Sequence, residues 1–241
     1  AAPSLIVWPE TAVPETFRAS GTAQRVVLGV VTSGVPLLVG ALDSHTAPDG
    51  ELRHYNASLL VGPDGACRRL YRKQHLVLFG EYVPFRRYVP WLGRLVPMDY
   101  DLHPGDEPVV FELEDPPLRF SVLICFEDTI RRLAAQFVQL GAQMLFVQTN
   151  DAWFDGTSGP RQHMIQSVFR AVETRVPVVR CANSGVTGWI DALGRIGGAG
   201  GELTGTLPVT GADGRPLEGF LIANVPYRSD GGACTFLMRR G

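Results

Sequence analysis

Residues 121–128, SVLICFED, place a cysteine at the end of an apolar run and follow it with two acidic residues. A thiol acts as a nucleophile only as the thiolate, whose formation acidic neighbours oppose and a nearby cation favours. Cys125 therefore needs a cation from elsewhere in the chain. Lys73 offers that cation, and Glu10 offers a base. A thiol, a lysine and a glutamate together form a complete set for acyl transfer.

The three side chains would divide the chemistry between them. Lys73 would favour the thiolate of Cys125 and later stabilise a tetrahedral oxyanion. Glu10 would take the proton during attack and relay it to the leaving group. Burial at a strand end raises the pKa of a carboxyl group unless a cation compensates, so Glu10 and Lys73 must be considered as a coupled pair.

Each of these residues follows a short run that predicts a strand. Glu10 follows LIVW, Lys73 follows RRLYR, Cys125 follows SVLI, and Asn150 with Asp151 follow LFVQT. In open α/β sheets, ligands bind at the carboxyl ends of the strands. The sequence therefore predicts that these distant segments converge on one pocket.

Further runs define the elements that must position the site. Strands are predicted at residues 4–10, 36–44, 56–65, 68–75, 118–126, 143–151, 176–185 and 185–194. Apolar residues at helical spacing predict two helices, marked by Ile130, Leu133, Ala134, Phe137 and Leu140 before a stop at Gly141, and by Met164, Ile165, Val168, Phe169 and Val172 before Pro177. The alternation of strand and helix predicts an α/β domain with a largely buried sheet.

The composition is that of a folded chain, with 45% hydrophobic and 19% charged residues. A formal net charge of -2 gives no electrostatic reason to expect nucleic acid as a partner. No apolar run approaches the ~18 to 20 residues of a membrane-spanning helix. Because the chain opens at AAPSLIVW without a methionine or a signal-like region, we expect a processed or excised segment.

The cysteines and histidines do not form a metal-binding pattern. The four cysteines show no CxxC pair, so neither a zinc ribbon nor a disulfide scaffold is indicated. The spacing of His75, His103 and His163 resembles no metal site, and we interpret these residues as structural. Cys67, Cys181 and Cys234 are likewise interpreted as structural thiols.

Three segments resemble the signatures of the nitrilase, or carbon-nitrogen hydrolase, superfamily. They are WPET around Glu10, RKQHLVLFGEYVPF around Lys73 and Glu81, and LICFED around Cys125. More narrowly, FGEYVPF, TNDAWFDGTSGPRQH and RCANSGVTGWIDALG are similar to the nitrilase-like domain of bacterial apolipoprotein N-acyltransferases. The similarity runs over nearly the whole chain, and three motifs in the right order are a specific signal.

The resemblance implies a single α/β domain over residues 1–241, folded as a four-layer αββα sandwich. It implies a catalytic triad of Glu10, Lys73 and Cys125, with Glu81 and Glu127 supporting it, and neither a metal nor a cofactor. From the residues alone, Glu81 could instead pair with Arg86 or Arg87, and Glu127 could merely cap the following helix.

The resemblance also implies substrates and a location. Cys125 would take a fatty acyl chain from a phospholipid as a thioester and pass it to the α-amino group of a diacylglyceryl apolipoprotein. The enzyme would lie in the cell inner membrane with this domain facing the periplasm. The family's domain begins with a further strand and helix and is flanked by membrane helices, so we expect an excised extracytoplasmic domain that lacks them.

Residues 81–102 support lipid as the substrate independently of the family. They mix aromatic and aliphatic side chains with prolines and arginines, a combination suited to a membrane interface. We expect this arm to dip into the bilayer beside the active site, with Tyr82, Phe85 and Trp91 as substrate-binding residues. Asn150, Trp153 and Phe154 are also expected to bind substrate.

Two other classes of function remain open from the sequence. A soluble carbon-nitrogen hydrolase could use the same triad to cleave a small amide or nitrile, but it would have little use for an exposed apolar arm. An inactive domain kept as a protein-binding module would be favoured by loss of a triad residue. Glu10, Lys73 and Cys125 are all present.

Overall fold

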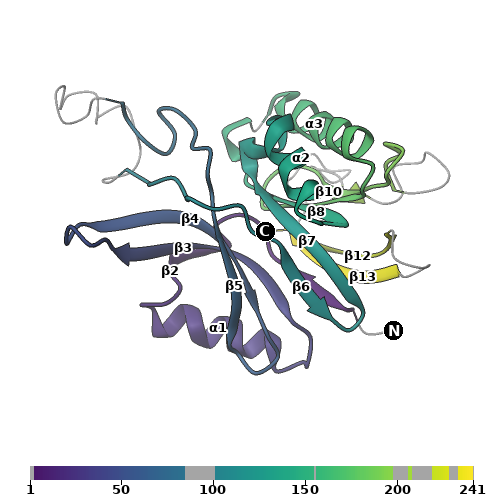
Figure 1. The fold of residues 1–241 in the computed structure, drawn as a ribbon. Coiled ribbons are helices and arrows are strands. Elements are labelled where there is room, and N and C mark those ends of the chain that lie inside the picture. Colours follow the sequence, from purple (N-terminus) through teal and green to yellow (C-terminus); the bar gives the residue numbers. More distant parts are fainter. Residues whose placement is uncertain are drawn as a thin grey trace.

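The computed structural model consists of two stacked β-sheets with helices on their outer faces (Figure 1). The structure describes residues 3–84, 101–154, 156–197, 206–207, 219–227 and 233–240. Helix α1 (Gly21–Val31) covers the first sheet, and α2 (Arg131–Gln139) and α3 (Gly159–Thr174) cover the second. This order of layers is the αββα sandwich expected from the sequence.

Among the residues that the structure describes, the first sheet has seven strands in the order β12-β13-β1-β3-β4-β5, with β2 paired to β3. Strand β1 is parallel to both of its neighbours, whereas β3, β4 and β5 form an antiparallel meander. Its strands are β1 (Leu5–Val7), β2 (Val13–Thr16), β3 (Leu37–Thr46), β4 (Leu52–Val61), β5 (Cys67–Arg72), β12 (Gly219–Pro226) and β13 (Ala233–Arg240).

The second sheet, in the described part of the chain, has six strands in the order β11-β10-β9-β8-β7-β6. Its centre, β7 to β9, is parallel, and antiparallel strands flank it on both sides. Its strands are β6 (Phe111–Glu114), β7 (Pro117–Ile124), β8 (Met144–Thr149), β9 (Val178–Ala182), β10 (Thr187–Ile190) and β11 (Thr206–Leu207).

Alternate residues of the first sheet enter different cores. Leu5 and Val7 of β1 pack in the cluster that includes the second sheet, whereas Ile6 and Trp8 pack with the buried face of α1. This alternation follows from the two-residue repeat of a strand, whose successive side chains point to opposite faces. A strand buried on both faces reads as a continuous apolar run, as LIVW does.

Helix α1 was not predicted from the sequence. Its buried face is Ala23, Val27 and Val31, at the four-residue spacing of a helix, and the Ser20 hydroxyl caps it by accepting a hydrogen bond from the Ala23 N–H. The segment is rich in valine and contains Gly29, and both features lower helix propensity. Tertiary packing on the first sheet outweighs that preference.

Helix α2 confirms Leu133, Ala134 and Phe137 of the predicted apolar face, which are buried, whereas Leu140 at its C-cap is 45% exposed. The apolar residues that mark α3 divide between its two sides: Met164 is buried and Val168 packs against the core, whereas Ile165, Phe169 and Val172 are exposed. Ser167 and Arg170 are buried in place of these three, because the inward side of α3 also meets buried charged groups.

The strands that carry the candidate site residues end at one edge. Strands β1, β3 and β5 share a direction, and so do β7 and β8 in the second sheet. Gly40 of β3 allows the Glu10 turn to pack against it, because a Cβ there would lie 2.3 Å from the Pro9 carbonyl oxygen. The predicted convergence is therefore built from both sheets.

Candidate active site

Lys73 follows β5 directly and is enclosed, with 1% of its side chain exposed. Its Nζ lies 2.9 Å from Oε2 of Glu81 and 3.6 Å from Oε1 of Glu10. The sequence suggested a loop ion pair as the alternative for Glu81, but this carboxylate bonds Lys73 and also accepts from the Val77 N–H at 2.8 Å. One buried cation is thus shared between two carboxylates.

Asn56 of β4 completes this group and was missed from the sequence. Its Nδ2 donates to Oε1 of Glu10 at 2.8 Å and to Oε1 of Glu81 at 3.0 Å. We call Glu10, Asn56, Lys73 and Glu81 the lysine cluster. The sequence did contain a signal: Asn56 lies inside β4 directly before the apolar run ASLLV, and a polar side chain buried there needs a hydrogen-bond partner.

The two oxygens of Glu10 have separate partners. Oε1 accepts from Asn56, and Oε2 accepts from the backbone N–H of Asn150 at 2.8 Å. Asn150, predicted to bind substrate, therefore reaches the site through its backbone, while its side chain accepts from the Ala152 N–H at 3.2 Å. These bonds fix the orientation of Glu10 at the meeting point of the two sheets.

Cys125 lies at the turn from β7 into the 3-10 helix η2 (Cys125–Thr129) and has a positive φ of 52°. Such a backbone is uncommon for a residue other than glycine, and residues held in it cluster at functional sites. A nucleophile on a sharp turn between a strand and a helix is presented at the edge of the sheet. The Cys125 side chain is accordingly half-buried rather than enclosed in the core.

Burial and, to a lesser extent, the charge of Glu10 raise the pKa of Cys125 to about 12, against the lowering effect of Lys73. Lys73 therefore lowers the pKa of Cys125, as predicted, but burial and Glu10 raise it by more. Cys125 is a thiol at neutral pH. Attack by this sulfur consequently requires a base to remove its proton.

Glu10 is suited to that task. Burial raises its pKa, with Lys73 opposing the shift and Glu81 adding to it, so Glu10 is a stronger base than an exposed glutamate. Burial lowers the pKa of Lys73, but Glu10, Cys125 and Glu81 together hold it above its ordinary value. Lys73 thus stays cationic beside the thiol.

Glu127 joins the loops that carry Cys125 and Lys73. Its Oε2 accepts from the Ile124 N–H at 2.8 Å, and its Oε1 accepts from the Tyr71 hydroxyl and the Gln74 N–H, each at 2.8 Å. Glu127 is completely buried, and burial raises its pKa to about 7 against the bonds and the charge that oppose the shift. It caps the short helix and also ties the two loops together.

The remaining candidate substrate residues are partly or largely exposed where the structure describes them. Tyr82 is half-buried and directly follows Glu81. Trp153 and Phe154, in the 3-10 helix η3 (Ala152–Phe154), are 68% and 45% exposed. Phe85 and Trp91 lie outside the described residues.

Two of the other cysteines, Cys67 and Cys181, have no contact with the lysine cluster among their described partners. Cys67 is exposed, and Cys181 is buried with its thiol donating to the Val7 carbonyl at 3.3 Å. The side chain of Cys234 is not among those described. Within the described ranges, no group of three or more His, Cys, Asp or Glu side chains is placed to hold a metal ion.

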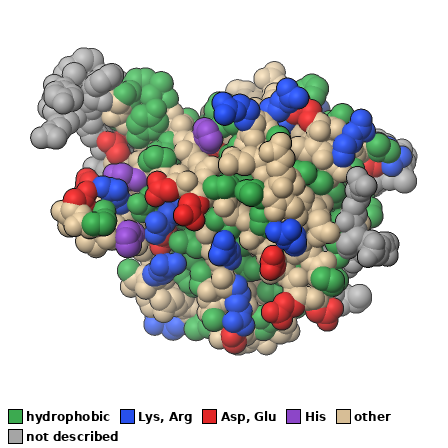
Figure 2. Space-filling model, viewed as in Figure 1, with side chains coloured by type: hydrophobic (Ala, Val, Ile, Leu, Met, Phe, Trp, Pro, Cys, Tyr) green, Lys and Arg blue, Asp and Glu red, His purple; other side chains and the backbone are tan. Residues whose placement is uncertain are grey.

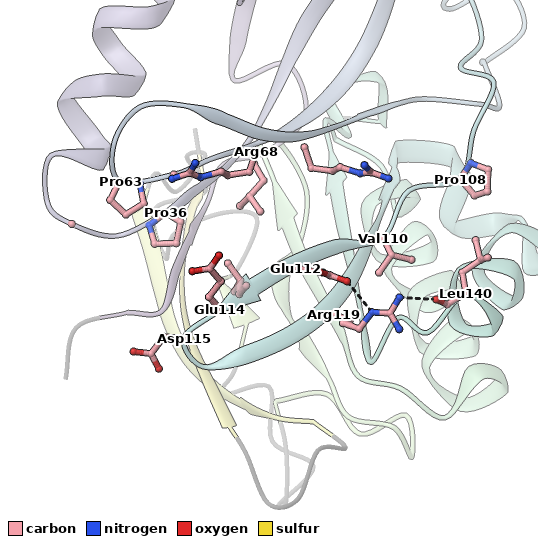
Figure 3. A pocket seen from close by; sticks show the side chains of 15 residues that line it. Pro36, Pro63, Arg68, Pro108, Val110, Glu112, Glu114, Asp115, Arg119 and Leu140 are labelled. Atoms are coloured by element: carbon pink, nitrogen blue, oxygen red, sulfur yellow. Dashed lines mark hydrogen bonds and ion pairs between the residues drawn. The ribbon is translucent and has the colours of Figure 1, made fainter.

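A separate cavity of about 800 Å³ opens at the opposite end of the strands (Figure 3). Its lining contains both acidic and basic side chains. Nε of Arg119 lies 3.3 Å from Oε1 of Glu112, and its Nη2 donates to the Leu140 carbonyl at 3.1 Å. On the face shown in Figure 2, acidic and basic side chains are also interspersed. None of the candidate catalytic residues lines this cavity.

Two sheets that bring a glutamate, a lysine and a cysteine to one edge define the nitrilase-like class of α/β proteins. The chain belongs to the carbon-nitrogen hydrolase family, whose family model matches residues 2–210. It is 37% identical over 194 residues to an apolipoprotein N-acyltransferase of Geobacter metallireducens. It is 36% identical over 215 residues to one of Chlorobaculum tepidum.

The alignments cover 80% and 79% of this chain but only 37% and 40% of those two relatives, respectively. The chain therefore spans well under half of their length. No helix in the described part of the chain is long and apolar enough to cross a membrane.

Solved structures support the fold. Nit3 of Saccharomyces cerevisiae, a member of branch 10 of the nitrilase superfamily, is 20% identical with a TM-score of 0.58, covering 80% of this chain and 70% of its own. An amidase from Nesterenkonia sp. is also 20% identical, with a TM-score of 0.54, covering 80% of this chain and 71% of its own. At these identities the similarity establishes the shared sandwich.

Proposed function

We propose that this chain is the catalytic domain of an apolipoprotein N-acyltransferase. Lys73 carries the proposal, because this buried cation is shared by Glu10 and Glu81 and is electrostatically coupled to the Cys125 thiol. The arrangement suits acyl transfer through a thioester. The names of the relatives support an apolipoprotein as the acceptor. The family resemblance of the sequence adds the diacylglyceryl form of that acceptor and a phospholipid as the donor.

In the first half-reaction, Glu10 accepts the proton of the Cys125 thiol as the sulfur attacks the ester carbonyl of the phospholipid. Lys73 stabilises the oxyanion of the tetrahedral intermediate. Collapse breaks the ester bond, and the departing lysophospholipid oxygen takes the proton from Glu10. The acyl chain remains on Cys125 as a thioester.

In the second half-reaction, the α-amino group of the S-diacylglyceryl cysteine attacks the thioester carbonyl. Glu10 accepts a proton from the nitrogen, the carbon–sulfur bond breaks, and the proton returns to Cys125. Water could also attack the thioester, which would hydrolyse it. The site therefore acts as a transferase only when the bound amine reaches the thioester carbonyl before water does.

The proposal places the protein in the cell inner membrane, with this domain facing the periplasm. Five side chains are proposed from the sequence to bind substrate: Tyr82, Phe85 and Trp91, on an arm that enters the membrane, and Trp153 and Phe154. We further propose that Trp153 and Phe154 contact the acyl chain. If Trp91→Glu left turnover of a phospholipid donor unchanged, the membrane role of the arm would be wrong.

The full-length protein in phospholipid vesicles tests the function directly when supplied with a diacylglyceryl-cysteine peptide. We expect N-acylated peptide and lysophospholipid in equal amounts, with Cys67→Ala as the active control and Cys125→Ala inactive. Cleavage of small amides with no transfer to the peptide would instead establish the hydrolase alternative.

A further inference from the structure

Behind the Cys125 turn, four charged side chains form a closed ring. His163 lies between two aspartates, with Nε2 2.9 Å from Oδ1 of Asp128 and Nδ1 2.7 Å from Oδ1 of Asp151. Arg180 closes the ring, because Nη1 donates to Oδ2 of Asp128 and Nη2 donates to Oδ2 of Asp151, each at 2.9 Å. We call these four residues the charge ring.

The charge ring joins four separate segments in the interior. Asp128 belongs to η2, Asp151 follows β8, His163 belongs to α3, and Arg180 belongs to β9. The side chains of Asp128, Asp151 and Arg180 are completely buried, and that of His163 is 9% exposed. Because Asp128 lies three residues after Cys125, the ring fixes the nucleophile turn to the surrounding elements.

A direct path leads from the charge ring to the sulfur. The Thr149 hydroxyl donates to Oδ1 of Asp151 at 2.8 Å, so in its hydrogen bond with Cys125 the Thr149 oxygen accepts from the thiol. The negative charge of Asp151 acts on Cys125 as well and raises the pKa of the thiol. The negative charge of Asp151, unless it is neutralised, therefore makes Cys125 harder to deprotonate.

The ring is balanced in charge, with two carboxylates against a guanidinium and an imidazolium. Burial lowers the pKa of His163, but its bonds to Asp128 and Asp151 raise it to about 9, against the repulsion of Arg180, whose Nη2 lies 2.9 Å from Nδ1. Arg170, the other buried charge of α3, instead donates to the Thr129 carbonyl and pairs with Glu173.

We propose that the charge ring is a positioning device for Cys125, which holds its turn and, by cancelling the charge of Asp151, keeps the thiol reactive. The proposal rests on the proposed function only in taking Cys125 as the nucleophile. Nothing in it depends on the identity of the acyl donor or acceptor.

The test is the rate at which iodoacetamide alkylates Cys125 as a function of pH, followed by peptide mass spectrometry on the whole chain. His163→Gln removes one cation, so we expect slower alkylation at neutral pH and a profile displaced to higher pH. Asp151→Asn removes one anion, and we expect a profile displaced to lower pH. A purely structural role would not give shifts of opposite sign.

Ser167→Ala is the matched control, because it removes a 2.6 Å hydrogen bond to Asp128 without changing any charge. We expect its profile to superimpose on that of the wild type. If His163→Gln fails to fold, Asp151→Asn decides alone. A profile unmoved in Asp151→Asn, or moved to higher pH, would overturn the proposal, whereas failure of the acyltransferase assay would leave it standing.

Discussion

The lysine cluster and the charge ring use the same kinds of side chain with opposite charge balance. In the lysine cluster, Glu10 and Glu81 share a single cation, and the pKa of Glu10 is raised. In the charge ring, two cations face two carboxylates, and burial of Asp151 is outweighed by His163 and Arg180, so the pKa of Asp151 is lowered.

The difference in charge balance suits the lysine cluster to proton transfer and the charge ring to holding the structure in place. An excess of buried carboxylate makes a good base, because protonation relieves the cost of burying charge. A balanced set has no such drive to exchange protons and serves to fix geometry. Both groups flank Cys125, which couples electrostatically to Glu10 and Lys73 on one side and to Asp151 on the other.

The largest expected effect on activity comes from Glu10→Gln, which removes the base and keeps the shape. We expect acylation of Cys125 by phospholipid to slow by about 10²–10⁴-fold, the usual contribution of general acid–base catalysis. The free energy of unfolding should fall by about 1–3 kcal/mol, because the amide nitrogen replaces one of the two oxygens that accept buried hydrogen bonds from Asn56 and Asn150. Rapid-quench measurement of acyl-enzyme formation checks this, and a loss below tenfold would remove Glu10 from the role of base.

Arg180→Met should affect stability more than any single change in the lysine cluster. It leaves two buried aspartates with one histidine, and breaking a buried pair of this kind costs about 3–5 kcal/mol. Urea unfolding monitored by circular dichroism measures the change. An unaltered urea midpoint would show that the charge ring does not stabilise the fold. The proposed difference in role between the charge ring and the lysine cluster would then be wrong.

Glu127 should contribute a pH dependence to stability. Because burial raises its pKa from 4.5 to about 7, the folded chain binds this proton more tightly than the unfolded chain does. The resulting stabilisation, on the order of 3 kcal/mol, is present below pH 4.5 and is lost as the pH rises through about 7. Glu127→Gln should flatten this decline in urea unfolding curves, and equal slopes in both proteins would contradict the assignment.

The smallest effect on stability is expected from Trp153→Ala, since this side chain is 68% exposed and belongs to neither group. The free energy of unfolding should stay within about 0.5 kcal/mol of the wild type. If Trp153 contacts the acyl chain, KM for vesicle phospholipid should rise several-fold with kcat unchanged. Val26→Ala on α1, also exposed, is the matched control, and equal kinetics in both variants would remove Trp153 from the substrate site.

The sequence predicted the site where short-range pattern and chemistry agreed. Glu10, Lys73 and Cys125 each end a strand, and the structure brings their segments to one edge. Asn56 and Arg180 were missed, because each lies inside a strand and its role depends on partners far away in the chain. His163 was interpreted only as structural, since the spacing of histidines reveals metal sites but not ion pairs with distant aspartates.

The fold, like the site, was predicted only in part. The apolar runs revealed the central strands and α2, whereas α1 was hidden by the low helix propensity of its valines and by Gly29. The error in α3 has a separate cause: Ile165 and Phe169 satisfy a helical repeat on the exposed side. Apolar periodicity cannot identify an inward face that is built from polar residues such as Ser167.

Intact mass spectrometry of the full-length protein tests the central claim most directly, using a phospholipid donor without an acceptor. We predict that the wild type gains the mass of one acyl chain, that Cys125→Ala gains none, and that a diacylglyceryl-cysteine peptide then discharges the adduct. An adduct that persists in Cys125→Ala, or transfer to the peptide by that variant, would contradict the assignment of Cys125 as the nucleophile.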